Sequence, residues 1–410
     1  MRPLRILTFS TLYPNEAQPH HGIFVENRLR HLVASGEVES VVVAPVPYFP
    51  FRSSRFGHWA TFARCPETEQ RHGISVHHPR YVVVPRIGMN AAPALLAAGV
   101  WRTVQRLHQI HDFDLVDAHY AYPDGVAAAW LGRRLRLPVV VTVRGTDINL
   151  IPRLRFPRYL IRRSLRRVAG VIAVSEALRD AVIEIGGAPD LLTVLRNGVD
   201  LDLFRPIEPH KARHNLALDG PTLLSVGHLI ERKGHDLAIR ALALLPEYRL
   251  LIVGDGPERA ALGQLATALG VHSRVRFLGP KPHDKLPAIY SAVDALVLAS
   301  TREGWPNVLL EAMACGTPVV ASNVWGNPEV VRSPAAGRLM EERSATGVAQ
   351  AVRALLSSGS DRGVTRRYAE GFSWDETSRG QIALFRRILG HSNADAGLPA
   401  ASSVYSDPVG

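Results

Sequence analysis

The stretch that decides the fold runs from Ser300 to Val320 and reads STREGWPNVLLEAMACGTPVV. A buried apolar strand is predicted to end near Ser300, and Gly304 allows the backbone to approach a partner closely. Pro306 suits the start of a helix, and Gly316 suits the end of the same helix. Strand, loop and helix in this order are typical of a parallel α/β sheet.

The loop and the helix start combine a positive helix end with two carboxylates. Free N–H groups at Asn307 and Val308 predict an anion site that suits a diphosphate. Glu303 lies in the loop and Glu311 lies eight residues later, inside the helix. Because their charge opposes a phosphate, both carboxylates are expected to accept hydrogen bonds from sugar hydroxyls. A bare pair at this spacing is more often two ordinary helix acids, so the interpretation depends on the whole string.

Apolar, β-branched runs separated by helical material recur on both sides of this string. In the first half, strands are predicted at residues 4–9, 41–44, 81–84, 115–118, 139–143 and 171–174. In the second half, they are predicted at residues 222–226, 249–253, 275–278, 295–299 and 318–321. Because parallel strands need long crossovers, this spacing predicts two Rossmann-like lobes. The tail at 391–410 is small, polar and expected to be disordered.

Composition excludes several classes of protein. The chain has 410 residues, of which 46% are hydrophobic and 21% charged, so it has enough apolar material for two packed cores. Its two cysteines, Cys65 and Cys315, cannot build a zinc site or a disulfide framework, which favours reduced thiols. Neither a secretory signal nor an apolar run long enough to span a bilayer is visible. We therefore expect a cytoplasmic protein that begins at Met1.

The positive charge is concentrated in the first half of the chain. Residues 1–205 hold 26 Arg and no Lys against 17 acidic residues, which gives this half a net charge of +9. The net charge of the whole chain is +11. Much of the excess lies between Arg153 and Arg167, where no acidic residue occurs. We call this the arginine patch; it comprises Arg153, Arg155, Arg158, Arg162, Arg163, Arg166 and Arg167. Such a patch attracts phosphate on a lipid, a nucleic acid or a small anion, although a solvated basic helix is the simpler interpretation.

Two further motifs lie in the second half: SVGHLIERKG at 225–234 and GDGP at 254–257. Together with the Ser300–Val320 string, they resemble the retaining glycosyltransferases of family 4, also called group 1. The resemblance extends from about residue 6 to residue 388. It implies the α/β GT-B fold, in which two Rossmann-like βαβ domains face each other across a deep cleft. The expected domains are residues 1–205 for the acceptor and 206–371 for the donor. FSWDE at 372–376 would begin a C-terminal helix, about 372–390, that crosses back to the first domain.

The resemblance implies that the second domain binds a nucleotide diphosphate sugar. Arg232 and Lys233 would stabilise the leaving diphosphate, which gains charge during transfer. Glu303 would hold the sugar and Glu311 the ribose, while the backbone at Leu278 would hold the base. The other residues expected to bind the donor are Gly22, His228, Gly254, Gly304, Trp305, Pro306, Asn307 and Val308.

In the first domain, the resemblance draws attention to polar residues after predicted strands. His119 matches a histidine on the acceptor side, although a hydrogen-bonded histidine at a strand end explains it equally well. Arg144 stands where the family usually has histidine, near the donor sugar, and supplies a fixed cation instead. Asp147 is grouped with the acceptor side and is expected to orient the loop. His228 also departs from the family, which usually has arginine there.

The expected reaction is transfer of a hexose, with retained configuration, from a UDP- or GDP-linked sugar to a hydroxyl. The acceptor is expected to be a lipid-linked glycan or a polysaccharide precursor, and the enzyme to lie peripherally on the inner face of an anionic membrane. No cofactor, no required metal and no nucleic-acid partner are expected. Two alternatives stay open at this point: a nucleotide-sugar epimerase of similar fold and a basic nucleic-acid-binding protein.

Overall fold

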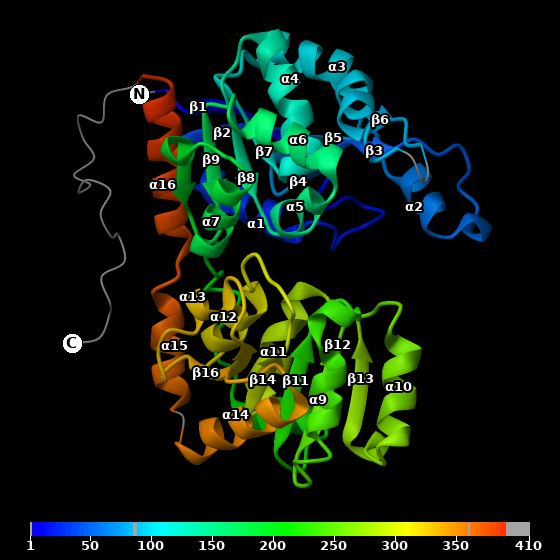
Figure 1. The fold of residues 1–410 in the computed structure, drawn as a ribbon, viewed down its shortest axis with the longest axis vertical. Coiled ribbons are helices and arrows are strands. Elements are labelled where there is room, and N and C mark those ends of the chain that lie inside the picture. Colours follow the sequence, from blue (N-terminus) through cyan, green and yellow to red (C-terminus); the bar gives the residue numbers. More distant parts are fainter. Residues whose placement is uncertain (1, 85–87, 360, 391–410) are drawn as a thin grey trace. The chain divides into compact units, whose positions relative to one another are not determined.

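The computed structural model describes residues 2–84, 88–359 and 361–390, so the predicted disordered tail lies outside the described residues. Contacts divide the chain into two compact units. Unit 1 consists of Met1–Arg196 and Asp375–Gly410, and unit 2 consists of Asn197–Trp374. Both units are α/β with a mainly parallel sheet (Figure 1), as the sequence predicted. The cleft expected between them stays a prediction.

Unit 1 is built on an eight-stranded sheet in the order β10-β9-β8-β7-β1-β2-β5-β4. Its strands are β1 (Leu4–Phe9), β2 (Val38–Val43), β4 (Thr68–Arg71), β5 (Ile74–His77), β7 (Leu115–His119), β8 (Val139–Val143), β9 (Gly170–Ala173) and β10 (Leu192–Val194). Neighbouring strands pair in parallel, except that β4 pairs with β5 in antiparallel fashion. A separate parallel pair joins β3 (Val46–Pro47) to β6 (Arg80–Tyr81). The central strands β7 and β8 are buried throughout because helices cover both faces.

The helices of unit 1 are α1 (Ile23–Ala34), α2 (His58–Arg64), α3 (Ala92–His111), α4 (Val126–Leu135), α5 (Thr146–Asn149), α6 (Arg155–Leu165), α7 (Glu176–Glu184) and α16 (Trp374–Ile388). The last of these comes from the C-terminal end of the chain and packs into the core of unit 1. Ile382 and Phe385 join the same buried apolar cluster as Ile6 and Val42. The C-terminal helix therefore returns to the first unit, as the resemblance implied.

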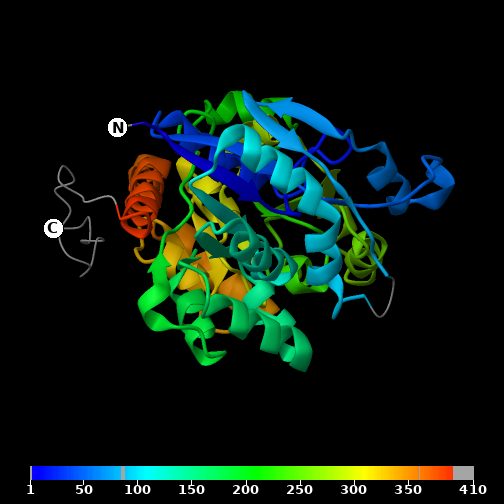
Figure 2. The same ribbon diagram turned by 90° about the horizontal axis from the view of Figure 1, so that it is seen from above.

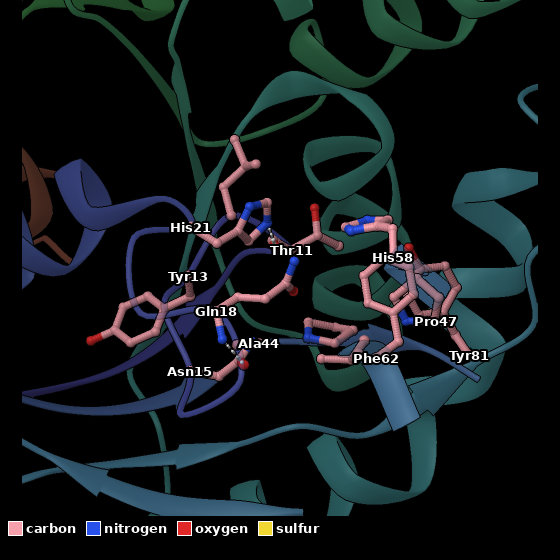
Figure 3. A pocket seen from close by; sticks show the side chains of 13 residues that line it. Thr11, Tyr13, Asn15, Gln18, His21, Ala44, Pro47, His58, Phe62 and Tyr81 are labelled. Carbon is pink, nitrogen blue, oxygen red and sulfur yellow. Dashed lines mark hydrogen bonds between the residues drawn. The ribbon is translucent and has the colours of Figure 1, made fainter. Parts of the chain in front are cut away.

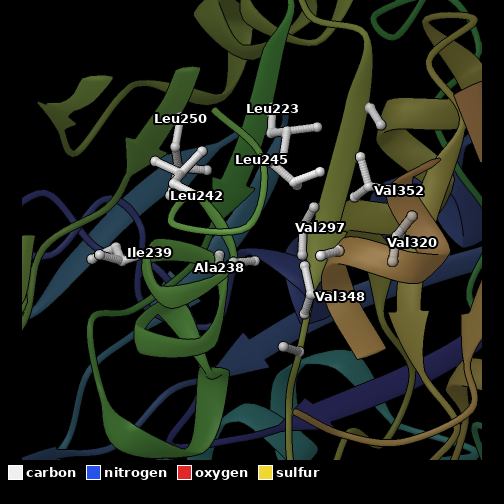
Figure 4. Packing of buried hydrophobic residues seen from close by; sticks show 14 of the residues in the cluster. Leu223, Ala238, Ile239, Leu242, Leu245, Leu250, Val297, Val320, Val348 and Val352 are labelled. Atoms are coloured by element: carbon white, nitrogen blue, oxygen red, sulfur yellow. The ribbon is translucent and has the colours of Figure 1, made fainter. Parts of the chain in front are cut away.

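Unit 2 is built on a six-stranded parallel sheet in the order β13-β12-β11-β14-β15-β16. Its strands are β11 (Thr222–Val226), β12 (Arg249–Val253), β13 (Val275–Gly279), β14 (Ala295–Leu298), β15 (Val319–Ser322) and β16 (Gly337–Met340). Its helices are α8 (Pro209–Asn215), α9 (His235–Ala241), α10 (Arg259–Ala268), α11 (Leu286–Ala292), α12 (Asn307–Ala314), α13 (Asn327–Val330), α14 (Ala345–Ser357) and α15 (Arg362–Glu370). Figure 4 shows part of its core, where Ile239 of α9 and Val348 of α14 belong to the same buried cluster as Val297 of β14.

The structural boundary falls at 196/197, nine residues before the predicted boundary at 205/206. Residues 197–205 belong to unit 2 because its other elements bind them. Val199 N donates to the carbonyl of Phe372 at 2.9 Å, and the Arg366 guanidinium donates to the carbonyls of Leu201 and Phe204. The return to unit 1 likewise falls at 374/375 rather than at 371/372.

One predicted strand is much shorter than expected. The apolar run Tyr81–Val84 pairs only at Arg80–Tyr81, and the side chains of Val82 and Val84 are 57% and 38% exposed. None of the helices in the described residues is long and apolar enough to cross a membrane. Both cysteines are free and buried.

Candidate functional site

The loops that follow β11, β12, β13 and β14 all emerge at the carboxyl edge of the unit 2 sheet, because these four strands run parallel. The sheet thereby gathers most of the predicted donor residues at one edge. They are His228, Arg232 and Lys233 after β11, Gly254 after β12, Leu278 at the end of β13, and Glu303 to Val308 after β14.

An ion pair joins two of these loops. Lys233 Nζ donates to Glu303 Oε1 at 2.6 Å, and Ser300 Oγ donates to the same oxygen at 2.7 Å. Arg232 Nη1 lies 3.8 Å from Glu303 Oε2 and donates to the Arg302 carbonyl at 3.0 Å. Burial alone would raise the pKa of Glu303, but the Lys233 charge and the hydrogen bonds from Lys233 and Ser300 lower it below its usual value. The site therefore holds a buried carboxylate beside two cations.

Glycines allow the loops after β11, β12 and β14 to pack backbone against backbone. Gly254 has a φ of +135°, and a Cβ there would lie 1.9 Å from the Gly227 carbonyl oxygen. At Gly234, with a φ of +69°, a Cβ would lie 2.1 Å from the Ala299 carbonyl oxygen. Any side chain at these positions would push the loops apart, so the glycines fix where Lys233 and Glu303 meet.

Helix α12 begins at Asn307, with Pro306 as its N-cap, which agrees with the helix start predicted near Pro306. No side chain caps its first N–H groups, among the residues that the structure describes. Asn307 N nevertheless donates to the Trp305 carbonyl at 3.1 Å, so the free N–H group predicted at Asn307 is already used and the one predicted at Val308 is the better candidate for an anion. Asn307 Oδ1 accepts a hydrogen bond from Asn197 Nδ2 at 3.2 Å. The Trp305 side chain is only 7% exposed and contacts the ring of Phe372, so most of it is part of the core.

Glu311 is held by residues that the sequence analysis did not single out. Its Oε2 accepts from the Tyr290 hydroxyl at 2.8 Å, and its Oε1 lies 3.3 Å from His283 Nε2. The ring of Phe204 lies edge-on to the His283 ring. Burial, followed by the charge of Glu311, raises the pKa of Tyr290 well above its usual value, so its hydroxyl donates. No motif signals Tyr290 or His283, because both come from the α11 region and meet Glu311 only in three dimensions.

In unit 1, Gly22 closes the loop after β1. It is the N-cap of α1 with a φ of +70°, and a Cβ there would lie 2.3 Å from the Leu12 carbonyl oxygen. His21 Nε2 lies 3.0 Å from the Thr11 carbonyl oxygen, across the same loop. A glycine at position 22 is therefore required by the loop itself, independently of any ligand.

His119 and Arg144 meet in a buried polar network. Arg144 Nη2 donates to His119 Nδ1 at 2.7 Å, and His119 Nε2 lies 3.4 Å from Asp117 Oδ2. Because arginine only donates, Nδ1 accepts and the ring proton faces Asp117. Burial lowers the pKa of His119, so the ring is neutral at pH 7. Burial and then the charge of Arg28 lower the pKa of Arg144 to about 9, which still leaves it charged.

Asp147 is fully buried, although the sequence groups it with the acceptor side. Its carboxylate accepts backbone hydrogen bonds from Ala121, Arg144 and Gly145 at 2.7 to 3.2 Å. Those bonds tie the loop after β8 to the loop after β7. Asp147 thus orients Arg144, in line with the loop role expected for it, and takes no part in the exposed patch.

Every arginine of the arginine patch is exposed, and four of them lie on α6. Within the described residues, none of the seven guanidinium groups pairs with a carboxylate. Leu154, Phe156 and Tyr159 are also about half exposed on the same stretch. The patch is therefore a basic surface with uncompensated charge.

A pocket of about 210 Å³ lies in unit 1, beside the loop after β1. No sequence motif indicates this pocket. Its lining comes from that loop, from the β2–β3 connection, and from α2 and β6 (Figure 3): Thr11, Leu12, Tyr13, Asn15, Gln18, His21, Ala44, Pro45, Val46, Pro47, His58, Phe62 and Tyr81. Across the described residues, no group of three His, Cys, Asp or Glu side chains could hold a metal ion.

Two family models match the chain: Glycosyltransferase Family 4 over residues 24–203 and Glycosyl transferases group 1 over residues 206–372. TuaC of Bacillus subtilis, named for teichuronic acid biosynthesis, is 30% identical over 332 residues, which is 79% of this chain and 82% of TuaC. The chain belongs to the group 1 glycosyltransferases. This assignment decides between the alternatives that the sequence left open, in favour of a transferase.

A second relative agrees with this assignment, and two solved structures show the same fold. The D-inositol 3-phosphate glycosyltransferase of Mycobacterium tuberculosis is 34% identical over 327 residues, 73% of this chain and 66% of the relative. Sucrose-phosphate synthase from Thermosynechococcus elongatus superposes with a TM-score of 0.76 at 22% identity, over 95% of this chain and 100% of that one. Anabaena HepE in complex with UDP and glucose superposes with a TM-score of 0.71 at 24% identity, over 93% of this chain and 98% of that one. The GT-B fold predicted from the sequence is confirmed.

Proposed function

We propose that this glycosyltransferase moves a hexose from a UDP- or GDP-linked sugar to an acceptor hydroxyl with retained configuration. The observation that carries the proposal is the contact of Lys233 with Glu303 at 2.6 Å, beside the uncapped start of α12. Cations and helix N–H groups suit a diphosphate, while a carboxylate kept charged suits sugar hydroxyls. The complexes of HepE with UDP, glucose and UDP-glucose support a sugar nucleotide as donor.

Each group would have a separate task during transfer. Arg232, Lys233 and the N–H group of Val308 at the helix start would stabilise the charge that develops on the leaving diphosphate. Glu303 would accept hydrogen bonds from the sugar, and Lys233 would then divide its three donors between Glu303 and a phosphate oxygen. Arg144 would add a fixed cation from unit 1. With these cations in place, we expect transfer without an added metal.

Glu311 would bind the ribose hydroxyls of the nucleotide. Each of its oxygens already has one partner, Tyr290 or His283, and keeps a second lone pair for a ligand. The two partners would hold the carboxylate in one orientation, so binding would cost little side-chain entropy.

The acceptor is proposed to be a lipid-linked glycan or a polysaccharide precursor, reached from the cytoplasmic face of a membrane. TuaC is named for teichuronic acid biosynthesis, and a structural neighbour is a lipopolysaccharide outer core galactosyltransferase. The exposed arginine patch supports attraction to an anionic surface, at about 1 kcal/mol for each arginine near it.

The test is nucleotide binding by calorimetry, with UDP, GDP and their common sugars, in the presence and absence of EDTA. The wild type should bind one nucleotide series, and Glu311→Gln should weaken that binding at least tenfold. Glu341→Gln, an exposed glutamate of the same unit, serves as the matched control and should bind like the wild type. Absence of binding to every nucleotide diphosphate, or binding that EDTA abolishes, would refute the corresponding part of the proposal.

A further inference from the structure

Exposed apolar side chains are distributed very unequally between the two units. Of thirteen large hydrophobic side chains exposed in the described residues, twelve belong to unit 1 and only Leu244 belongs to unit 2. Three of the twelve lie in one short stretch: Tyr48 is 59% exposed, Phe51 53% and Trp59 37%. We call residues 48–64 the aromatic segment.

The aromatic segment is held together mainly by its own rings. The ring of Phe49 lies 5.5 to 5.9 Å from the rings of Phe51, Phe56 and Trp59. Phe51 and Phe56 stack at 5.1 Å. α2, which the segment contains, stands away from the main sheet of unit 1 in both ribbon views (Figures 1 and 2). The segment is thus a projecting cluster of rings, and burial in the core does not explain its composition.

Neighbouring exposed residues extend this surface. Tyr48 N donates to the carbonyl of Tyr81 at 2.8 Å, which continues the β3–β6 pairing and brings Val82 beside the segment. Val82 is 57% exposed. The apolar surface therefore comes from two stretches of chain, and isolated exposed residues do not account for it.

The charge of the segment has a single sign. It contains Arg52, Arg55 and Arg64, and no acidic residue occurs from residue 40 to residue 66. All three arginines are exposed, and the guanidinium of Arg55 lies 4.8 Å above the Phe56 ring. Rings that include Trp and Tyr, interleaved with arginines, suit the boundary between lipid headgroups and acyl chains.

The segment also borders the pocket of unit 1. His58 and Phe62 of α2 line that pocket together with Thr11 and Tyr81 (Figure 3). A molecule held in a bilayer by an apolar tail would therefore meet the pocket next to the rings.

We propose that the aromatic segment is a membrane anchor, whose rings insert into the interfacial region of an anionic bilayer while its arginines bind lipid phosphates. This role differs from that of the guanidinium groups of the arginine patch, whose attraction is electrostatic and declines with salt. Insertion of rings buries apolar area, so it persists when salt screens the charges. Docking by the aromatic segment does not depend on the transfer chemistry.

Co-sedimentation with vesicles tests the anchor, using phosphatidylcholine vesicles with and without phosphatidylglycerol, at low and high salt. The wild type should bind the anionic vesicles and keep part of that binding at high salt. Phe51→Ser/Trp59→Ser should lower the partition coefficient at least tenfold at both salt concentrations. Ile110→Ser/Trp130→Ser removes comparably exposed side chains elsewhere in unit 1. This control variant should keep a partition coefficient within about twofold of the wild-type value. Arg158→Gln/Arg162→Gln should weaken binding only at low salt.

A second measurement reports insertion directly. Brominated lipids should quench part of the tryptophan fluorescence of the wild type. Trp59→Phe keeps an aromatic ring, so this variant should still bind the vesicles but should lose the quenching. Unaltered thermal unfolding and nucleotide binding of each variant establish that it is folded. The proposal is overturned if the wild type does not bind anionic vesicles or if Phe51→Ser/Trp59→Ser binds them like the wild type. It is also overturned if Trp59→Phe leaves the quenching unchanged. A wild-type dimer that this variant converts to a monomer would assign the surface to a second copy instead.

Discussion

Gln381 Nε2 of α16 donates to Asp117 Oδ2 of β7 at 2.8 Å, across 264 residues of sequence. The amide oxygen of the same side chain accepts from Arg28 Nε at 2.7 Å. All three side chains are buried, so one amide bridges a cation and a carboxylate that have left water. The C-terminal helix is therefore fixed to unit 1 by polar as well as apolar contacts.

Replacing Gln381 should destabilise unit 1. Gln381→Leu keeps the volume but removes a donor from Asp117 and an acceptor from Arg28, at a cost of about 2–4 kcal/mol. Urea unfolding measures the loss. Arg379→Gln, an exposed change on the same helix, should stay within about 0.5 kcal/mol of the wild type. Equal stability of the two variants would contradict a structural role for this network.

Replacing Lys233 should impair transfer. Lys233→Met removes a cation from the proposed diphosphate site and leaves Glu303 with a higher pKa, because its nearest positive charge is gone. We expect kcat/KM to fall about 100- to 1000-fold. Lys285→Met, an exposed lysine of the same unit, is the control and should retain wild-type activity. Activity of Lys233→Met near that of the control would remove Lys233 from the mechanism.

A histidine at position 144 should make transfer sensitive to pH. The pKa of Arg144 is about 9, so its charge is constant between pH 5.5 and 7.5. A histidine has an ordinary pKa of about 6.5, and burial lowers it further, so Arg144→His loses its charge as the pH rises. The kcat of the variant should decline across this range relative to wild type. Parallel pH profiles would show that the charge at this position is not used.

Asp124 should make stability depend on pH with an unusual sign. Burial raises its pKa to about 8, although hydrogen bonds from Thr11 N and Oγ1 to Oδ2 oppose the shift. The folded state therefore keeps a proton that the unfolded state loses near pH 4, so this residue lowers stability as the pH rises from about 4 to 8. Asp124→Asn cannot ionise, so the difference in unfolding free energy between variant and wild type should grow over that range. A constant difference would mean that Asp124 is ionised in the folded protein.

The strands that decide the architecture were predictable because they are apolar on both faces. Leu4–Phe9, Val139–Val143 and Thr222–Val226 begin and end where the sequence predicts. Strands at the margins were missed: β4 alternates exposed and half-buried polar residues, and β16 contains the exposed Arg338. Their place in the sheet depends on pairing with a neighbour rather than on their own hydrophobicity.

The candidate site was predictable where its residues lie in loops that directly follow strands. Lys233 and Glu303 each follow a strand, so parallel topology was enough to bring them together. The partners of Glu311 and of Asp117 could not be found in this way, because Tyr290 and Gln381 meet them only through packing. The aromatic segment could not be predicted for a related reason. Its rings differ from core residues only in their exposure, and the sequence alone does not show which aromatic side chains are exposed.

Unit 1 is discontinuous along the chain, and this has a consequence for its synthesis. Its last helix leaves the ribosome only after all of unit 2 has been translated. At about 5–20 residues per second, that delay is on the order of ten to forty seconds. During this time Arg28 and Asp117 lack their shared amide, and the core cluster lacks Ile382 and Phe385. The nascent first unit therefore exposes charges and apolar side chains that favour recognition by chaperones.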